Sequence, residues 1–74
     1  MITLRFLHDT PFDMFEGTYK LARDCYGDSN LLITYDSRTD PGHIILEIWG
    51  IHTVEEIEND LAKYSHWFTA EGDE

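Results

Sequence analysis

The chain has 74 residues, of which 42% are hydrophobic, and this is enough for one small core. Fifteen acidic residues against five basic ones give a formal net charge of −10. Nucleic acids and anionic membranes are bound by clustered Lys and Arg, so this charge excludes both as direct partners. The single cysteine, Cys25, excludes an internal disulfide and a cysteine-based metal site.

The cellular location is inferred from two features of the chain. So short a chain without a disulfide framework indicates a reducing compartment. Residues 1–7 lack a basic segment, and their apolar run is too short for a signal peptide or a membrane span. We therefore expect a soluble, cytoplasmic protein.

The first third of the chain predicts a strand followed by a helix. Alternation over residues 2–7 places Ile2, Leu4 and Phe6 on one face of a short strand. A helix is expected from about Pro11 to Tyr26, with Thr10 as its N-cap and Gly27 at its end. Its apolar stripe consists of Met14, Phe15, Thr18, Leu21, Ala22, Cys25 and Tyr26.

Two residues of this helix call for an explanation. Cys25 falls on the apolar side, where a free cysteine usually behaves as a small hydrophobe rather than as a reactive thiol. Gly17 costs about 1 kcal/mol relative to Ala in a helix interior. We interpret Gly17 as a point of close packing between the helix and a strand.

The most clearly patterned stretch is residues 31–50, LLITYDSRTDPGHIILEIWG. Two runs with period-two alternation flank a turn over residues 36–42, which predicts an antiparallel hairpin. Pro41 fixes φ in this turn, and Gly42 tolerates a positive φ.

The last third predicts a second helix. Thr53 and Glu56 form a capping box, Thr-x-x-Glu, in front of an apolar periodic run. The stripe of this helix is Val54, Ile57, Leu61, Tyr64 and Phe68, and the helix is expected to end near Phe68 or Thr69. Residues 70–74 read as a frayed acidic tail.

The order of these elements predicts an α+β fold. We expect a single domain over residues 1–69, a two-layer sandwich of βαββα order, followed by the acidic C-terminal tail over residues 70–74. Two helices would cover one face of a three-stranded antiparallel or mixed sheet. In topology this resembles a ferredoxin-like fold without its last strand.

The sheet would have one covered and one open face. The more apolar set is assigned to the core: Ile2, Leu4, Phe6, Leu31, Ile33, Tyr35, Ile44, Leu46 and Ile48. The open face then carries Thr3, Arg5, Leu7, Leu32, Thr34, Ile45, Glu47 and Trp49. An exposed Trp beside Ile and Leu is typical of an interface anchor. The alternative is that Trp49 folds against the second helix or the tail, and a one-residue register shift would exchange the two faces.

The second helix has an acidic side. Glu55, Glu56, Glu58 and Asp60 lie off its apolar stripe. They are either a solvated face with favourable charge at the helix N-terminus, or a negative patch that imitates phosphates and occupies a basic groove.

Motifs for catalysis are missing from the sequence. His8, His43, His52 and His66 are scattered without a metal-ligand spacing, and no phosphate loop or nucleophile elbow is present. His8-Asp9 and Asp40 with His43 are short polar pairs of a kind that occurs often by chance. We expect no enzyme activity, no cofactor and no metal.

The leading hypothesis is a small acidic protein that binds and inhibits a larger basic, nucleic-acid-handling protein by blocking its nucleic-acid site. This profile is similar in character to phage-encoded anti-defence proteins, including anti-CRISPR inhibitors, and to antitoxins or immunity proteins. A second hypothesis is a structural or regulatory domain that self-associates as a homodimer, and a third is a small enzyme or metal-binding protein. The expected partner-binding residues are Arg5, Leu32, Ile45, Glu47, Trp49, Glu55, Glu58 and Asp60.

Overall fold

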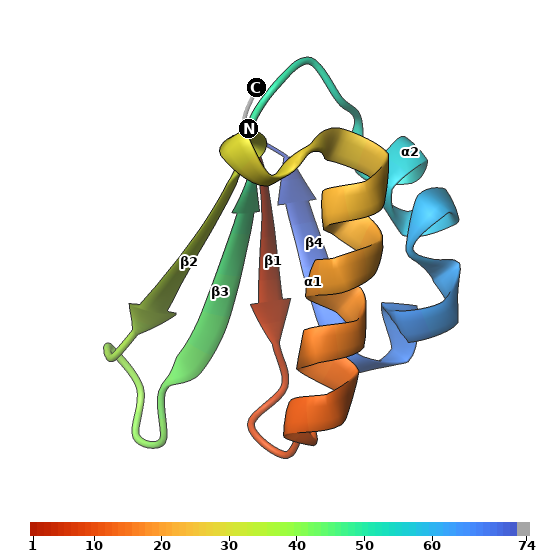
Figure 1. Cartoon of the computed structure of the whole chain (residues 1–74). Coiled ribbons are helices and arrows are strands. Elements are labelled where there is room, and N and C mark those ends of the chain that lie inside the picture. Colours follow the sequence, from red (N-terminus) through yellow and green to blue (C-terminus); the bar gives the residue numbers. More distant parts are fainter. Residues whose placement is uncertain (73–74) are drawn as a thin grey trace.

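A four-stranded antiparallel sheet forms one layer of the computed structural model, which describes residues 1–72 (Figure 1). Helices α1 and α2 and two 3₁₀ segments, η1 and η2, form the rest. In chain order the elements are β1 (Ile2–Phe6), α1 (Phe12–Tyr26), η1 (Asp28–Asn30), β2 (Leu31–Asp36), β3 (His43–Ile48), α2 (Val54–Asp60), η2 (Ala62–Trp67) and β4 (Phe68–Gly72).

The topology is that of the ferredoxin-like arrangement, βαββαβ with strand order β2-β3-β1-β4. The predicted α+β class is confirmed, whereas the predicted three-stranded sheet is wrong by one strand. β4 pairs with β1, with Phe68 opposite Phe6 and Ala70 opposite Leu4. Residues 70–72, expected in an acidic tail, therefore belong to the sheet, and residues 73 and 74 of that tail lie outside the described residues.

The core lies between the sheet and the helices. Phe6 is at its centre, with its ring centroid 4.9 Å from that of Phe15 on α1 and 5.6 Å from that of Phe68 on β4. The buried apolar side chains on the helix-facing side of the sheet are Ile2, Leu4, Phe6, Leu46, Ile48 and Phe68, and those facing them are Phe15, Ala22, Ile57 and Leu61. The predicted inward face of β1 therefore meets the helices as expected, and so do Leu46 and Ile48 of β3.

Helix α1 is close to its predicted range, but two of its details differ. Thr10 does not cap the helix, because its hydroxyl donates to the carbonyls of Leu7 (2.8 Å) and Trp67 (3.1 Å). Cys25 is exposed rather than buried, since the fully buried stripe of the helix ends at Ala22.

Two glycines are required by close contacts. A Cβ atom at Gly17 would lie 2.5 Å from Oη of Tyr64, so α1 packs closely on η2 and not on a strand as predicted. A Cβ atom at Gly42 would lie 2.7 Å from the Tyr35 ring. The role predicted for Gly42, a positive φ, is not the one it has, because the positive values within residues 1–72 are at Gly27 and Gly50.

Helix α2 begins as predicted and ends early. The Thr53 hydroxyl accepts a hydrogen bond from the Glu56 amide at 3.1 Å. The helix ends at Asp60, and η2 carries the chain to Trp67. Leu61 is buried and Tyr64 packs against the core, so the predicted stripe does face inward although it does not form one continuous helix.

We expect Thr53→Ala to lower the free energy of unfolding by about 1 kcal/mol, because the Glu56 amide loses its acceptor. Urea denaturation measures this loss. Thr53→Ser keeps a hydroxyl acceptor at the same position and serves as the control, with a midpoint close to that of the wild type. An unchanged midpoint for Thr53→Ala would contradict the cap.

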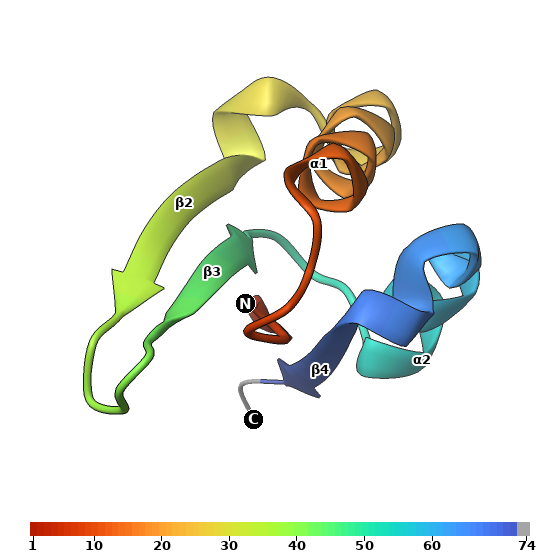
Figure 2. The same ribbon diagram turned by 90° about the horizontal axis from the view of Figure 1, so that it is seen from below.

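The helices cover only part of the sheet. Figure 2 shows both helices on one side, with β2 and the hairpin end extending beyond them. Ile33, Tyr35 and Ile44 are therefore 49%, 62% and 37% exposed, although they lie on the helix-facing side. Their assignment to the core was wrong, because two short helices are too narrow to cover the β2 side of the sheet.

Candidate binding surfaces

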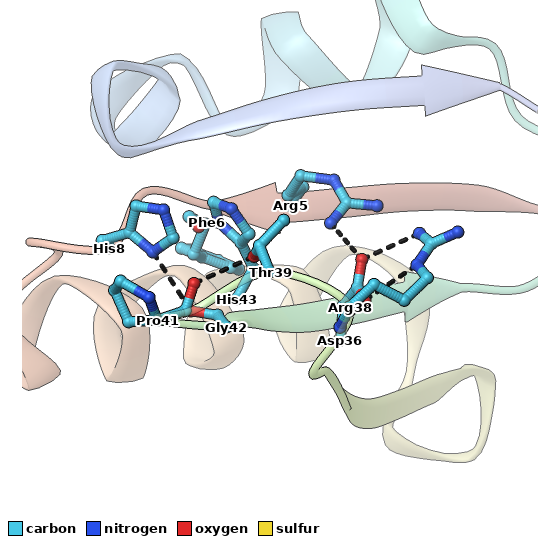
Figure 3. Close-up of polar contacts among 9 residues, drawn as sticks. All are labelled: Arg5, Phe6, His8, Asp36, Arg38, Thr39, Pro41, Gly42 and His43. Carbon is cyan, nitrogen blue, oxygen red and sulfur yellow. Dashed lines mark hydrogen bonds and ion pairs between the residues drawn. The ribbon is translucent and has the colours of Figure 1, made fainter.

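A cluster of three charged residues lies on the open face of the sheet. Asp36, at the end of β2, accepts hydrogen bonds from Arg5 of β1 and from Arg38 of the hairpin turn (Figure 3). The Arg38 contact is bidentate, with Nε at 2.9 Å and an Nη at 2.8 Å from the two carboxylate oxygens. The cluster borders a shallow hollow of about 290 Å³ that is also lined by Thr3, Thr34, Ile45 and Glu47.

The cluster is suited to binding rather than to proton transfer. Hydrogen bonds from Arg38 and then Arg5 hold the pKa of the Asp36 carboxyl far below its ordinary range. A carboxylate with such a low pKa is a poor general base near neutral pH. One carboxylate between two guanidinium groups leaves the cluster with a net positive charge, in contrast to the rest of the chain.

The other residues predicted on the open face have different exposures. Leu32 is 48% exposed, and Glu47 is half-buried beside Arg5 at the hollow. Ile45, however, is only 5% exposed, between its cross-strand partners Arg5 and Thr34. The open face is therefore more polar at its surface than the sequence alone suggested.

Trp49 follows the end of β3, and its side chain is 49% exposed. Its amide donates to the carbonyl of Asn30 at 2.8 Å, which ties the end of β3 to the start of β2. The side chain is thus available for contacts outside the core.

We expect Trp49→Ala to change the free energy of unfolding by less than about 1 kcal/mol and to weaken association with a partner by about 2 kcal/mol or more. Urea denaturation and titration calorimetry give the two values. Trp67→Ala is the matched control for stability, because Trp67 is more buried than Trp49 and its loss should cost more. A large loss of stability for Trp49→Ala would instead place this side chain in the core.

An apolar groove opens between α1 and the β2–β3 hairpin. Its volume is about 280 Å³, and its rim includes Phe12, which is 69% exposed, and Tyr35. Further lining residues are Phe6, Leu7, Phe15, Pro41 and Ile44. This groove was not predicted from the sequence, because the helix-facing side of the sheet was expected to be fully covered. The available signal was the number of apolar residues per strand, which exceeds what two short helices can bury.

His8 lines this groove and lies against His43. The two rings are tilted by 33° to each other, with centroids 3.9 Å apart (Figure 3). Nδ1 of His43 donates to the carbonyl of Phe6 at 2.7 Å, and Nδ1 of His8 to that of Gly42 at 3.2 Å. Since carbonyls only accept, each Nδ1 carries the proton. The two histidines of the short polar pairs noted in the sequence, His8-Asp9 and Asp40 with His43, thus bond to backbone carbonyls, and these contacts tie the loop after β1 to the hairpin.

An acidic surface forms where the C-terminal half of α1 meets α2. The Tyr26 hydroxyl donates to Asp60 at 2.7 Å, and burial together with this carboxylate raises the pKa of Tyr26. Burial, then the charges of Asp60 and Asp24, also raise the pKa of the Cys25 thiol, which makes the reactive thiolate rarer. The exposed carboxylates of these two elements are Asp24, Glu55, Glu56, Glu58 and Asp60, and they are called the acidic surface below; Glu58 projects from a different side of α2 than Asp60 does.

The predicted partner-binding residues fall into separate groups. Glu55, Glu58 and Asp60 lie on α2, on the helix-covered side of the sheet. Arg5, Leu32, Ile45 and Glu47 belong to the opposite side, and Trp49 lies at the end of β3. The acidic and open-face residues are therefore not brought together into one site. Asp24 was not among the predictions, because its approach to α2 depends on how the two helices pack.

Neither a metal centre nor a membrane span is found in residues 1–72. These residues contain no group of three or more His, Cys, Asp or Glu side chains placed to hold a metal ion. No helix among them is long and apolar enough to cross a membrane. Comparison with protein-family models, curated proteins and solved structures gave no match for this chain.

Proposed function

We propose that this chain is a non-enzymatic inhibitor that binds a larger basic protein through its acidic surface and blocks that protein's nucleic-acid site. The observation that carries the proposal is the distribution of charge. Two elements far apart in the sequence, the end of α1 and α2, carry five exposed carboxylates, and the Tyr26–Asp60 hydrogen bond joins these two elements. The net charge of −10 would steer the chain toward a positively charged partner.

Two of the five basic residues lie close in the sequence to the carboxylates of the acidic surface: Arg23, which precedes Asp24 in the last turn of α1, and Lys63, which follows α2. Arg5 and Arg38 are engaged by Asp36 on the other side of the sheet, and Lys20 lies 3.5 Å from Glu16 in the middle of α1. The amine of Lys63 lies over the ring of Tyr64, 5.6 Å from its centroid. Five carboxylates against these two basic residues leave the acidic surface with an excess of negative charge that can act on a partner.

A basic groove that binds nucleic acid is the partner surface that fits this charge best. Such grooves hold Lys and Arg at positions that neutralise phosphates, and carboxylates fixed on two packed helices can occupy the same positions. The fixed geometry lowers the entropic cost of binding, because the Tyr26–Asp60 hydrogen bond already joins the two helices. Phage anti-defence proteins, antitoxins and immunity proteins are the classes of inhibitor that this proposal includes.

The test has two steps. The partner is first captured with the tagged chain from a lysate of the organism that encodes it and is identified by mass spectrometry. The purified partner is then mixed with a labelled duplex, and the chain is added while fluorescence anisotropy is recorded. We expect stoichiometric release of the duplex. A partner that holds the chain and the duplex together, each with its own affinity unchanged, would contradict the blocking role.

A further inference from the structure

The outer edge of β2 offers free backbone groups. β2 is first in the strand order, and β3 is its one neighbour within residues 1–72. The hydrogen bond from the Trp49 amide to the Asn30 carbonyl marks these two residues as a hydrogen-bonded pair of the antiparallel ladder. Because such pairs alternate, the even-numbered residues of β2 bond to β3. The N–H and C=O groups of Ile33 and Tyr35 therefore face outward.

The side chains of this edge are apolar and exposed. Leu32 is 48% exposed on the open side of the sheet, while Ile33 and Tyr35 are 49% and 62% exposed on the other side. Sheet edges are commonly protected by charges, prolines or bulges, and residues 31–35 contain no charge and no proline. The opposite edge strand, β4, does carry an exposed charge at Glu71. The edge of β2 is thus open to the addition of another strand.

The charges at the two ends of β2 indicate which strand could be added to its edge. Arg38 follows the end of β2, and its positively charged side chain is 80% exposed although it pairs with Asp36. The start of β2 is preceded by Asp28, which is exposed. Antiparallel pairing of two β2 strands about Ile33 would bring Arg38 of each copy beside Asp28 of the other, because both residues are five positions from Ile33. The strand that complements β2 in both shape and charge is therefore β2 itself.

We propose that β2 pairs antiparallel with β2 of a second copy of this chain, so that the two four-stranded sheets join into one. The two-fold axis passes near Ile33. A shift of the axis to Thr34 would place Leu32 opposite the ionised Asp36, which is unfavourable. With the axis near Ile33 the opposed pairs are Ile33 with Ile33, Leu31 with Tyr35, and Leu32 with Thr34.

The backbone supports the same register. The outward N–H and C=O of Ile33 bond to those of Ile33 in the second copy, and the Tyr35 N–H meets the outward carbonyl of Leu31. The Leu31 N–H already donates to the carbonyl of Asp28. This bond ends the new ladder at Leu31 and limits the pairing to the strand itself.

The proposal is tested by sedimentation equilibrium of the wild type and of two lysine variants, from about 1 µM to about 1 mM. Ile33→Lys places two like charges opposite each other at the axis, and we expect it to weaken the dimer at least about tenfold. Ile51→Lys is the matched control, because Ile51 is fully exposed on the loop between β3 and α2. Both variants change the net charge equally. The control should stay within about threefold of the wild type.

Amide hydrogen exchange locates the interface without any substitution. We expect the amides of Ile33 and Tyr35 to become protected as the wild-type concentration rises, while those of Leu32 and Thr34 are protected throughout by β3. The dimer should also tighten, at least about threefold, between about 0.05 M and 0.5 M salt, because salt screens the repulsion between two acidic chains. Binding of the basic partner should weaken over the same range, so the two associations are distinguishable.

Three results would overturn the proposal. The first is a wild type that stays monomeric up to about 1 mM. The second is a dimer that Ile33→Lys and Ile51→Lys weaken equally. The third is a dimer in which the Ile33 and Tyr35 amides exchange at the same rate at every concentration, which would place the interface elsewhere.

Discussion

Replacing Phe6 by alanine is expected to lower the free energy of unfolding by about 4 kcal/mol. The Phe6 ring is 1% exposed and contacts the rings of both Phe15 and Phe68. Its loss would leave a cavity at the point where β1, α1 and β4 meet. Small domains are stable by only about 5–15 kcal/mol, so this is a large share of the total. Urea denaturation followed by circular dichroism measures the change.

Phe12→Ala is the matched control, because it makes the same substitution on the same chain. Phe12 is 69% exposed at the rim of the apolar groove, so we expect it to cost less than about 1 kcal/mol. Equal losses for the two variants would mean that the groove is closed in solution and that Phe12 belongs to the core.

The contrast between these two phenylalanines shows what the sequence can and cannot predict. Period-two alternation correctly identified the side of each strand that faces the helices, as Leu4, Leu46 and Ile48 confirm. Alternation carries no information on how far the helices extend across a sheet. Ile33 and Tyr35 have the same pattern as buried residues but lie beyond the helices, where they are exposed. The extent of the cover depends on the length and packing of α2, which has only seven residues.

The fourth strand was missed for a related reason. Leu61, Tyr64 and Phe68 are spaced by three and four residues, which fits a continuing α-helix. The chain instead forms the 3₁₀ segment η2, whose three-residue period keeps Leu61 and Tyr64 on one side. Phe68 then starts β4 because the edge of β1 is available to pair with it. This pairing joins residues at opposite ends of the chain, so no local pattern reports it.

The candidate surfaces, too, were predictable from the sequence only where they depend on a local pattern. The carboxylates of α2 were found from sequence because their spacing places them off the apolar stripe of one helix. The contribution of Asp24 and the outward edge of β2 depend on tertiary packing and strand order. They became visible only with the structure.

Removing three charges from the acidic surface is expected to slow association with a basic partner at least about tenfold at low salt. The variant is Glu55→Gln, Glu58→Gln and Asp60→Asn. It preserves side-chain shape, leaves Glu56 of the capping box in place, and keeps an oxygen at residue 60 that can accept from the Tyr26 hydroxyl. Glu55 lies in the first turn of α2, where the loss of its charge costs about 0.3–1 kcal/mol, whereas Glu58 and Asp60 lie in the last turn and give no such stabilisation, so the fold should survive.

A control with the same net charge separates a local effect from a global one. Asp9→Asn, Asp13→Asn and Asp40→Asn remove three exposed charges near the start of α1 and in the hairpin turn, away from α2. If the acidic surface itself contacts the partner, the control should keep most of the wild-type on-rate. If only the net charge matters, both triple variants should slow association equally.

High salt should remove the difference in on-rate between the wild type and the acidic-surface variant. At about 0.5 M salt the Debye length falls to about 4–5 Å, so the charges of the acidic surface should no longer accelerate encounter. The on-rates of the wild type and of the acidic-surface variant should then converge, while at low salt they differ. Surface plasmon resonance against the captured partner, across a salt series, measures both. Equal on-rates at low salt would show that Glu55, Glu58 and Asp60 only solvate α2, and the blocking role would lose its physical basis.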